Sequence, residues 1–180
     1  MRIKIISLVI ILAFGLILGG CNSIGNDTSI PDGMVIAEND LADYTFCYPE
    51  DWELDMNSTM MSVIGGGTAL HPANKSISVM VLDLANPNVG AIDFWNEYKA
   101  SFDGTFKEFT AEEPTEVTVD DNIGCTVVYT AKITDATYKY AQTIVIKQGT
   151  VYLITFTATP DDYNETIDVY NNVLNTFKFK

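Results

Sequence analysis

The feature that most restricts this chain is an apolar run at its start. Residues 1–20 contain 14 apolar residues, no acidic residue, and two basic residues, Arg2 and Lys4, ahead of the apolar run at residues 5–18. A helix needs about 20 apolar residues to cross a membrane, so this run is too short for a span and suits the apolar part of a signal peptide. We therefore expect residues 1–20 to direct export and to take no part in the folded domain.

The sequence Leu-Gly-Gly-Cys, residues 18–21, stands at the end of this run. They resemble the lipobox of bacterial lipoproteins, in which cleavage falls just before a cysteine that carries lipid. The resemblance implies cleavage between Gly20 and Cys21, a diacylglyceryl group on the Cys21 sulfur, and a further acyl chain such as palmitate on the new amine. Because about two acyl chains give stable anchoring, the mature chain is expected on the extracytoplasmic face of a bacterial membrane, at the cell membrane or cell surface.

Removing residues 1–20 changes the charge balance and defines the domains. It leaves 8 basic residues against 24 acidic ones, a net charge of −16. Nucleic-acid binding requires clusters of Lys and Arg, so no nucleic-acid partner is expected. Residues 22–32 are polar and contain Gly25 and Pro31, which is typical of a linker. We assign residues 21–43 to the lipidated cysteine and a flexible linker, and residues 44–180 to one folded domain.

Short strand-like runs dominate that domain. Strand patterns occur at residues 44–48, 60–64, 68–71, 76–84, 117–119, 123–133, 138–147 and 150–158. Residues 76–84 are apolar on both faces, which predicts a central strand covered on both sides. Turns are predicted at Asp120-Asp121-Asn122 and at Gln148-Gly149.

Two later segments have helical spacing, residues 91–102 and residues 163–177. The second has a clear start, because Thr159 offers a hydroxyl N-cap, Pro160 suits the first helical position, and Asp161-Asp162 places carboxylates at the positive end of the helix dipole. Hairpins outnumber crossovers in this order of elements. The pattern predicts an α+β fold, a central antiparallel β-sheet flanked by helices.

Two aromatic motifs frame the domain. Tyr48-Pro49-Glu50-Asp51-Trp52 ends its first strand, and Tyr-Leu-Ile-Thr-Phe at residues 152–156 precedes a helix that ends at Phe177. Over residues 40–180 this order resembles PsbP-like domains, with their Tyr-Pro-x-x-Trp signature, including the DcrB-like bacterial lipoproteins of the PsbP superfamily. The resemblance implies an α/β/α sandwich that acts as a docking or accessory module and not as an enzyme.

Residues with catalytic or metal-binding chemistry are scarce. His71 is the single histidine, no Gly-x-Ser-x-Gly motif occurs, and no two cysteines are closely spaced. These absences argue against a nucleophile–histidine site and against zinc, so no catalytic residue, metal ligand or cofactor is assigned beyond the lipid on Cys21. The run Gly65-Gly66-Gly67 lacks the Lys-Ser/Thr ending of a phosphate loop and is interpreted as a turn.

Acidic pairs recur along the chain, at Glu50-Asp51, Glu112-Glu113, Asp120-Asp121 and Asp161-Asp162. Neighbouring residues on a strand point apart, so these pairs do not indicate the facing carboxylates of a glycosidase. Asp120-Asp121-Asn122 is interpreted as a hairpin turn in preference to a calcium site, because no EF-hand spacing surrounds it.

Two further sets of residues leave alternatives open. Cys47 and Cys125 lie in strand-like runs of an exported protein, where a disulfide is chemically allowed, although the pattern favours buried free thiols. Trp52, Tyr138, Tyr140 and Tyr152 either pack in the core, which is favoured, or line a binding surface.

These observations support two hypotheses about function. The first is a membrane-anchored, non-catalytic binding or accessory module that docks to an envelope protein partner. The alternative is a lipoprotein receptor for a small molecule or cation, since a net charge of −16 attracts cations more than anions.

Overall fold

The computed structural model describes residues 30–56, 60–65, 75–84, 86–102 and 105–180. The expected signal segment, Cys21, the strand expected at residues 68–71 and His71 lie outside these ranges. No helix within them has the length and apolar character needed to span a membrane.

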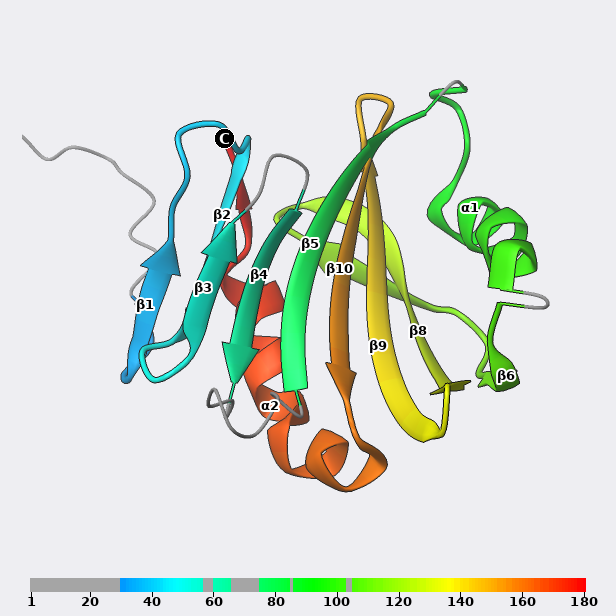
Figure 1. Cartoon of the computed structure of the whole chain (residues 1–180). Coiled ribbons are helices and arrows are strands. Elements are labelled where there is room, and N and C mark those ends of the chain that lie inside the picture. The colour runs from blue at the N-terminus through cyan, green and yellow to red at the C-terminus, as the bar shows by residue number, and fades with distance from the viewer. Residues whose placement is uncertain (1–29, 57–59, 66–74, 85, 103–104) are drawn as a thin grey trace, which may run out of the picture.

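An eight-stranded sheet forms the centre of the described part of the chain (Figure 1). Its spatial order is β3 (Glu53–Met56), β4 (Met60–Gly65), β5 (Lys75–Asp83), β10 (Thr150–Ala158), β9 (Ala136–Lys147), β8 (Asn122–Ile133) and β6 (Lys107–Ala111), with β7 (Thr115–Val119) also paired to β8. The pairings described between these strands are antiparallel. The predicted turn at Gln148-Gly149 joins β9 to β10, and both of its residues have positive φ, 52° and 85°.

Helices lie on both faces of this sheet. They are α1 (Ala91–Tyr98), continued by the 3-10 turn η1 (Lys99–Phe102), and α2 (Pro160–Thr176). Alternation along β10 separates two cores, because Ile154 packs in the cluster that contains α2 residues while Leu153 packs in the cluster that contains Trp95 of α1. In Figure 1, α2 crosses behind the sheet and α1 lies at its β8 end. This arrangement confirms the predicted α+β fold.

A second, three-stranded sheet of β1 (Met34–Ala37), β2 (Tyr44–Pro49) and β11 (Lys178–Phe179) lies beside α2 in the described structure. Because β1 pairs with β2, from Met34 opposite Pro49 to Ala37 opposite Phe46, the fold begins well before the linker boundary expected at residue 43. A strand of four residues is too short to show an alternating pattern, and its stability comes from pairing with β2.

The prediction for β5 is correct in position and wrong in coverage. The strand lies inside the sheet between β4 and β10, and its residues Ile77 and Val79 are fully buried on the α2 side. Met80 and Leu82 on the opposite face are exposed. Among the described residues, α1 contacts β8 and β9 on that face and Phe102 of η1 packs on Tyr129 of β8, so the apolar residues of β5 extend beyond these helical contacts.

The start of α2 is as the sequence predicts. Thr159 is the N-cap residue, and its Oγ1 accepts a hydrogen bond from the Asp162 backbone N–H at 3.3 Å and donates to the Asp162 carboxylate at 2.6 Å. The other end of α2 is fixed by aromatic packing. Phe177 stacks on Tyr44 and Phe46 of β2, with ring centroids 5.3 Å and 6.2 Å apart.

Candidate functional site

A groove runs along one flank of α2. The helix packs against β2, β10 and β9, and the sheet continues past it to β8 and β7. Between the helix and these last strands lies a groove of about 320 Å³. Its lining residues are Glu112, Glu113, Thr115, Val117, Thr126, Val128, Ala141, Tyr163, Ile167, Tyr170, Asn171 and Leu174.

Pro114 explains why the edge of the sheet opens here. Both β6 and β7 pair with β8, and residues 112–114 interrupt them. The Glu112 N–H still donates to the Val128 carbonyl at 2.9 Å, whereas proline has no N–H to continue the ladder. The interruption therefore places two exposed carboxylates, Glu112 and Glu113, at the rim of the groove.

The floor of the groove is largely apolar. Its apolar residues come from β7, β8, β9 and α2, and Tyr170 is one of them. The Tyr170 hydroxyl donates to the Ile154 carbonyl at 3.0 Å and lies 2.6 Å from Thr143 Oγ1, which is also bonded to Thr126. Complete burial raises the pKa of Tyr170, so its hydroxyl remains neutral and structural at any physiological pH.

The Lys139 side chain lies at the Tyr163 end of the groove. The Lys139 ammonium lies 4.2 Å from the centroid of the Tyr163 ring. Burial, and then the negative charge of Glu112, raise the pKa of Tyr163. Lys139 also lines a smaller hollow of about 140 Å³ that shares Glu112 and Val128 with the groove. Neither Glu112 nor Glu113 forms an ion pair with a described residue.

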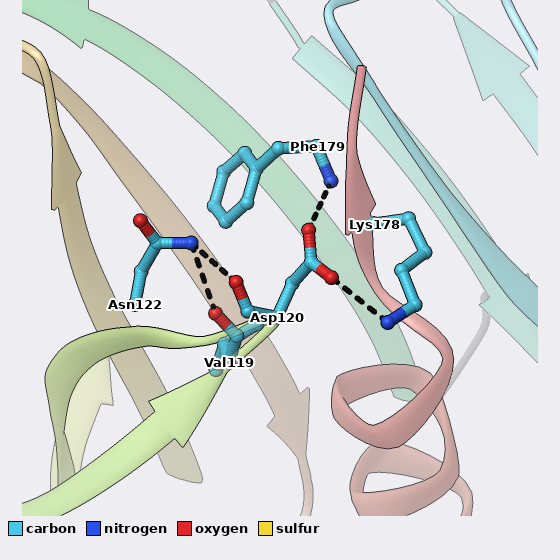
Figure 2. Close-up of polar contacts among 5 residues, drawn as sticks. All are labelled: Val119, Asp120, Asn122, Lys178 and Phe179. Atoms are coloured by element: carbon cyan, nitrogen blue, oxygen red, sulfur yellow. Dashed lines mark hydrogen bonds and ion pairs between the residues drawn. The ribbon is translucent and has the colours of Figure 1, made fainter. Parts of the chain in front are cut away.

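The acidic turn after β7 has a different environment, which Figure 2 shows. Asp120 and Asp121 both have positive φ, 45° and 62°, as a two-residue hairpin between β7 and β8 requires. The Asp120 carboxylate accepts from Lys178 Nζ at 2.8 Å and from the Phe179 N–H at 3.0 Å. Asn122 Nδ2 donates to the Asp120 carbonyl at 2.5 Å.

The hydrogen-bonding capacity of the Asp120 carboxylate is therefore used within the fold, by Lys178 and Phe179. Burial alone would raise the pKa of this carboxyl, but the hydrogen bonds from Lys178 and Phe179 and the charges of Lys178 and Lys147 hold it below its ordinary value. Val119 pairs with Asn122 across this turn, which confirms the hairpin interpretation, and Asp120 links the turn to β11. Among the described residues, no group of three or more His, Cys, Asp or Glu side chains is placed to hold a metal ion.

The four aromatic residues considered as a binding surface do not share one. Trp52 and Tyr152 are buried in the α2-side core, while Tyr140 is buried and Tyr138 half-buried in the α1-side core. Trp52 packs so closely on Gly65 that a Cβ there would fall 2.3 Å from its ring. These four side chains are divided between the cores on the two faces of the sheet, as the favoured core-packing alternative expects.

The two cysteines are separate buried thiols in the structure. Cys47 lies on β2 of the small sheet and Cys125 on β8 of the large one. Burial raises the pKa of the Cys125 thiol to about 11, so it is protonated and unreactive near neutral pH. The structure thus has the free-thiol arrangement and not the disulfide alternative.

The groove was not predicted from the sequence, although its signal was present. In the sequence, Glu112-Glu113 is distinguished only as one acidic pair among several. The informative feature is Pro114 after it, between two strand-forming runs, because a proline there breaks an edge strand and opens the sheet. Whether α2 lies beside this opening depends on tertiary packing, which the local sequence pattern does not encode.

Similar structures establish the fold. Cyanobacterial PsbP (CyanoP) from Synechocystis has a TM-score of 0.62 at 14% identity, with 91% of this chain and 99% of that chain covered. LpqN of Mycobacterium tuberculosis, described as involved in cell envelope biogenesis, has a TM-score of 0.59 at 13% identity, covering 85% of this chain and 87% of its own. PA94 from Pseudomonas aeruginosa has a TM-score of 0.53 at 12% identity, with coverages of 77% and 91%.

By sequence alone, the chain matches no family model and no curated protein. The structural likeness nevertheless identifies an α+β fold of the PsbP-like kind, as the aromatic motifs implied. At these identities the likeness defines the fold, and the function has to be argued from the groove.

Proposed function

We propose that this chain is a membrane-anchored, extracytoplasmic accessory module that docks to a protein partner of the bacterial envelope through the α2 groove. The observation that carries the proposal is the groove itself, an apolar floor between α2 and β7–β8 with two unpaired carboxylates on its rim. Interface cores are apolar with polar rims, so this arrangement suits docking. The envelope role described for LpqN, a protein of the same fold, adds support.

The anchor belongs to the same proposal. Lipid on Cys21 would hold the module at the membrane surface, and residues between Cys21 and Met34 would let it reach a neighbouring protein. Growth with an alkyne analogue of palmitate should label the full chain and should not label a Cys21→Ala variant. Equal labelling of the two chains would contradict attachment at Cys21.

The docking site can be tested by cross-linking in cells with matched positions. Asn171 and Thr115 line the groove, whereas the exposed residues Asn172, next to Asn171, and Thr118, three residues after Thr115, lie outside the groove lining. Each position is replaced in turn by the photoreactive residue p-benzoylphenylalanine in the full-length lipoprotein. We expect one envelope protein to be joined to the chain from Asn171 and Thr115 and not from Asn172 and Thr118.

The same experiment can refute the proposal. Products of equal yield from all four positions, or an absence of products from the groove positions, would show that the groove is not a docking site. Mass spectrometry of the joined peptides identifies the partner and the segment of it that contacts the groove.

A further inference from the structure

The two charged side chains that line the groove are both carboxylates. Glu112 and Glu113 form the rim on the sheet side. On the helix side, α2 contains four acidic residues and no Lys or Arg. One of them, Asp168, lies three residues before Asn171 of the groove and so on a neighbouring part of the helix surface. A groove with this rim repels acidic partners and attracts basic ones.

The ion pairs among the described residues do not involve the rim carboxylates. Lys178 is paired with Asp120, and Lys132 is paired with Glu108 at 3.1 Å. Lys139 is placed over the Tyr163 ring at one end of the groove. No ion pair with a described residue reaches Glu113, so the middle of the rim keeps its negative charge for an incoming group.

The volume and exposure of the groove indicate which kind of ligand it suits. A volume of about 320 Å³ is near the lower end of the range for ligand pockets. Glu112, Glu113, Thr115 and Asn171 among its lining residues are exposed, so the groove is open to solvent. Small-molecule sites usually enclose most of their ligand, whereas an open groove of this size suits apolar side chains held on the surface of a larger partner.

We infer that the groove recognises a basic–apolar segment of its protein partner. In such a segment an apolar side chain fills the floor formed by Val117, Val128 and Leu174, and a nearby Lys or Arg pairs with Glu112 or Glu113. This inference rests on the proposed function and specifies the chemistry of its partner.

The test uses the purified full chain and an array of short immobilised peptides. Each peptide carries one Leu, Phe or Trp beside one Lys or Arg, and a matched set carries Glu in place of the basic residue. The chain is compared with a Glu112→Gln/Glu113→Gln variant. A Glu53→Gln/Asp55→Asn variant has the same loss of charge on two exposed positions of β3, far from the groove lining, and serves as the control.

Basic–apolar peptides should bind the unmodified chain and the β3 control equally. Binding to the Glu112→Gln/Glu113→Gln variant should be about 3- to 10-fold weaker, and added salt should reduce that difference. The Glu-containing peptides should not bind. Equal binding of basic and acidic peptides, equal binding to both double variants, or binding of neither set to any chain would overturn the inference.

Failure of this inference can be separated from failure of the proposed function. If groove positions cross-link a specific partner in cells through a segment without Lys or Arg, the docking function stands and the basic–apolar chemistry is refuted. If the groove positions yield no specific product, the docking function itself is refuted.

Discussion

Two acidic pairs flank the same strand, and they have different surroundings. Glu112-Glu113 precedes β7 and Asp120-Asp121 follows it. Asp120 is bonded to Lys178 and to the Phe179 N–H, which ties the end of β7 to the last strand of the chain. Glu112 and Glu113 have no ion pair with a described residue and border an open groove.

The difference between these pairs lies in what the fold places opposite them. At the Asp120 end, α2 ends in the aromatic cluster around Phe177 and delivers Lys178 to the turn. At the Glu112 end, Pro114 opens the sheet edge, and α2 presents apolar and amide side chains. Asp120 is therefore structural because Lys178 is brought to it, whereas Glu112 and Glu113 have no such lysine among the described ion pairs.

The largest predicted effect concerns Phe177, at the end of α2 near the Asp120 turn. Phe177→Ala should lower the free energy of unfolding by about 3–5 kcal/mol, because Phe177 is fully buried among aromatic rings and its removal leaves a cavity. Leu174→Ala, one turn earlier at the groove, should lower it by only about 1 kcal/mol, since that side chain is half-buried. Urea unfolding of both variants measures this difference. Equal losses would contradict the conclusion that α2 is tightly packed at Phe177 and only partly covered at the groove.

Asp120→Asn should have an intermediate effect. Loss of the charged partner of Lys178 should lower the free energy of unfolding by about 1 kcal/mol at neutral pH, because Lys178 is partly solvent-exposed and the pair is screened. The pKa of Asp120 is lowered in the fold, so the stabilisation is complete above the unfolded pKa of about 4 and disappears as pH falls through the folded value. The variant should therefore lose less stability than the unmodified chain on acidification below about pH 4.

Asp121→Asn is the matched control for that prediction. Asp121 is exposed, has positive φ and belongs to no ion pair with a described residue. Asn tolerates the left-handed conformation, so the turn should be retained. Its urea midpoint and acid profile should match those of the unmodified chain. A loss as large as that of Asp120→Asn would show that turn geometry and not the Lys178 contact determines stability.

The smallest effect on stability is expected at the groove rim. The Glu112→Gln/Glu113→Gln variant should unfold at the same urea concentration as the unmodified chain, because both side chains are exposed and unpaired among the described residues. A clear loss of stability would assign these carboxylates a structural role like that of Asp120 and remove the contrast between the two ends of β7.

The parts predicted from sequence are those with strong local causes. The α2 start followed from Thr159 and Pro160, and the Gln148-Gly149 turn followed from its flanking strands. Short strands such as β1 and β11 were missed because pairing with β2 stabilises them. The groove was missed because it depends on where α2 crosses the sheet, while the buried positions of Tyr140 and Tyr152 depend on which face each strand presents to a helix.

We propose that the α2 groove is the binding surface and that the Asp120 turn is not. NMR of the isotopically labelled chain during titration with a basic–apolar peptide from the array tests this most directly. We predict that shifts change at Val117, Val128, Ile167 and Leu174, while Asp120 and Lys178 keep their signals. Changes centred on Asp120 and Lys178, or on the exposed face of β5, would contradict the account.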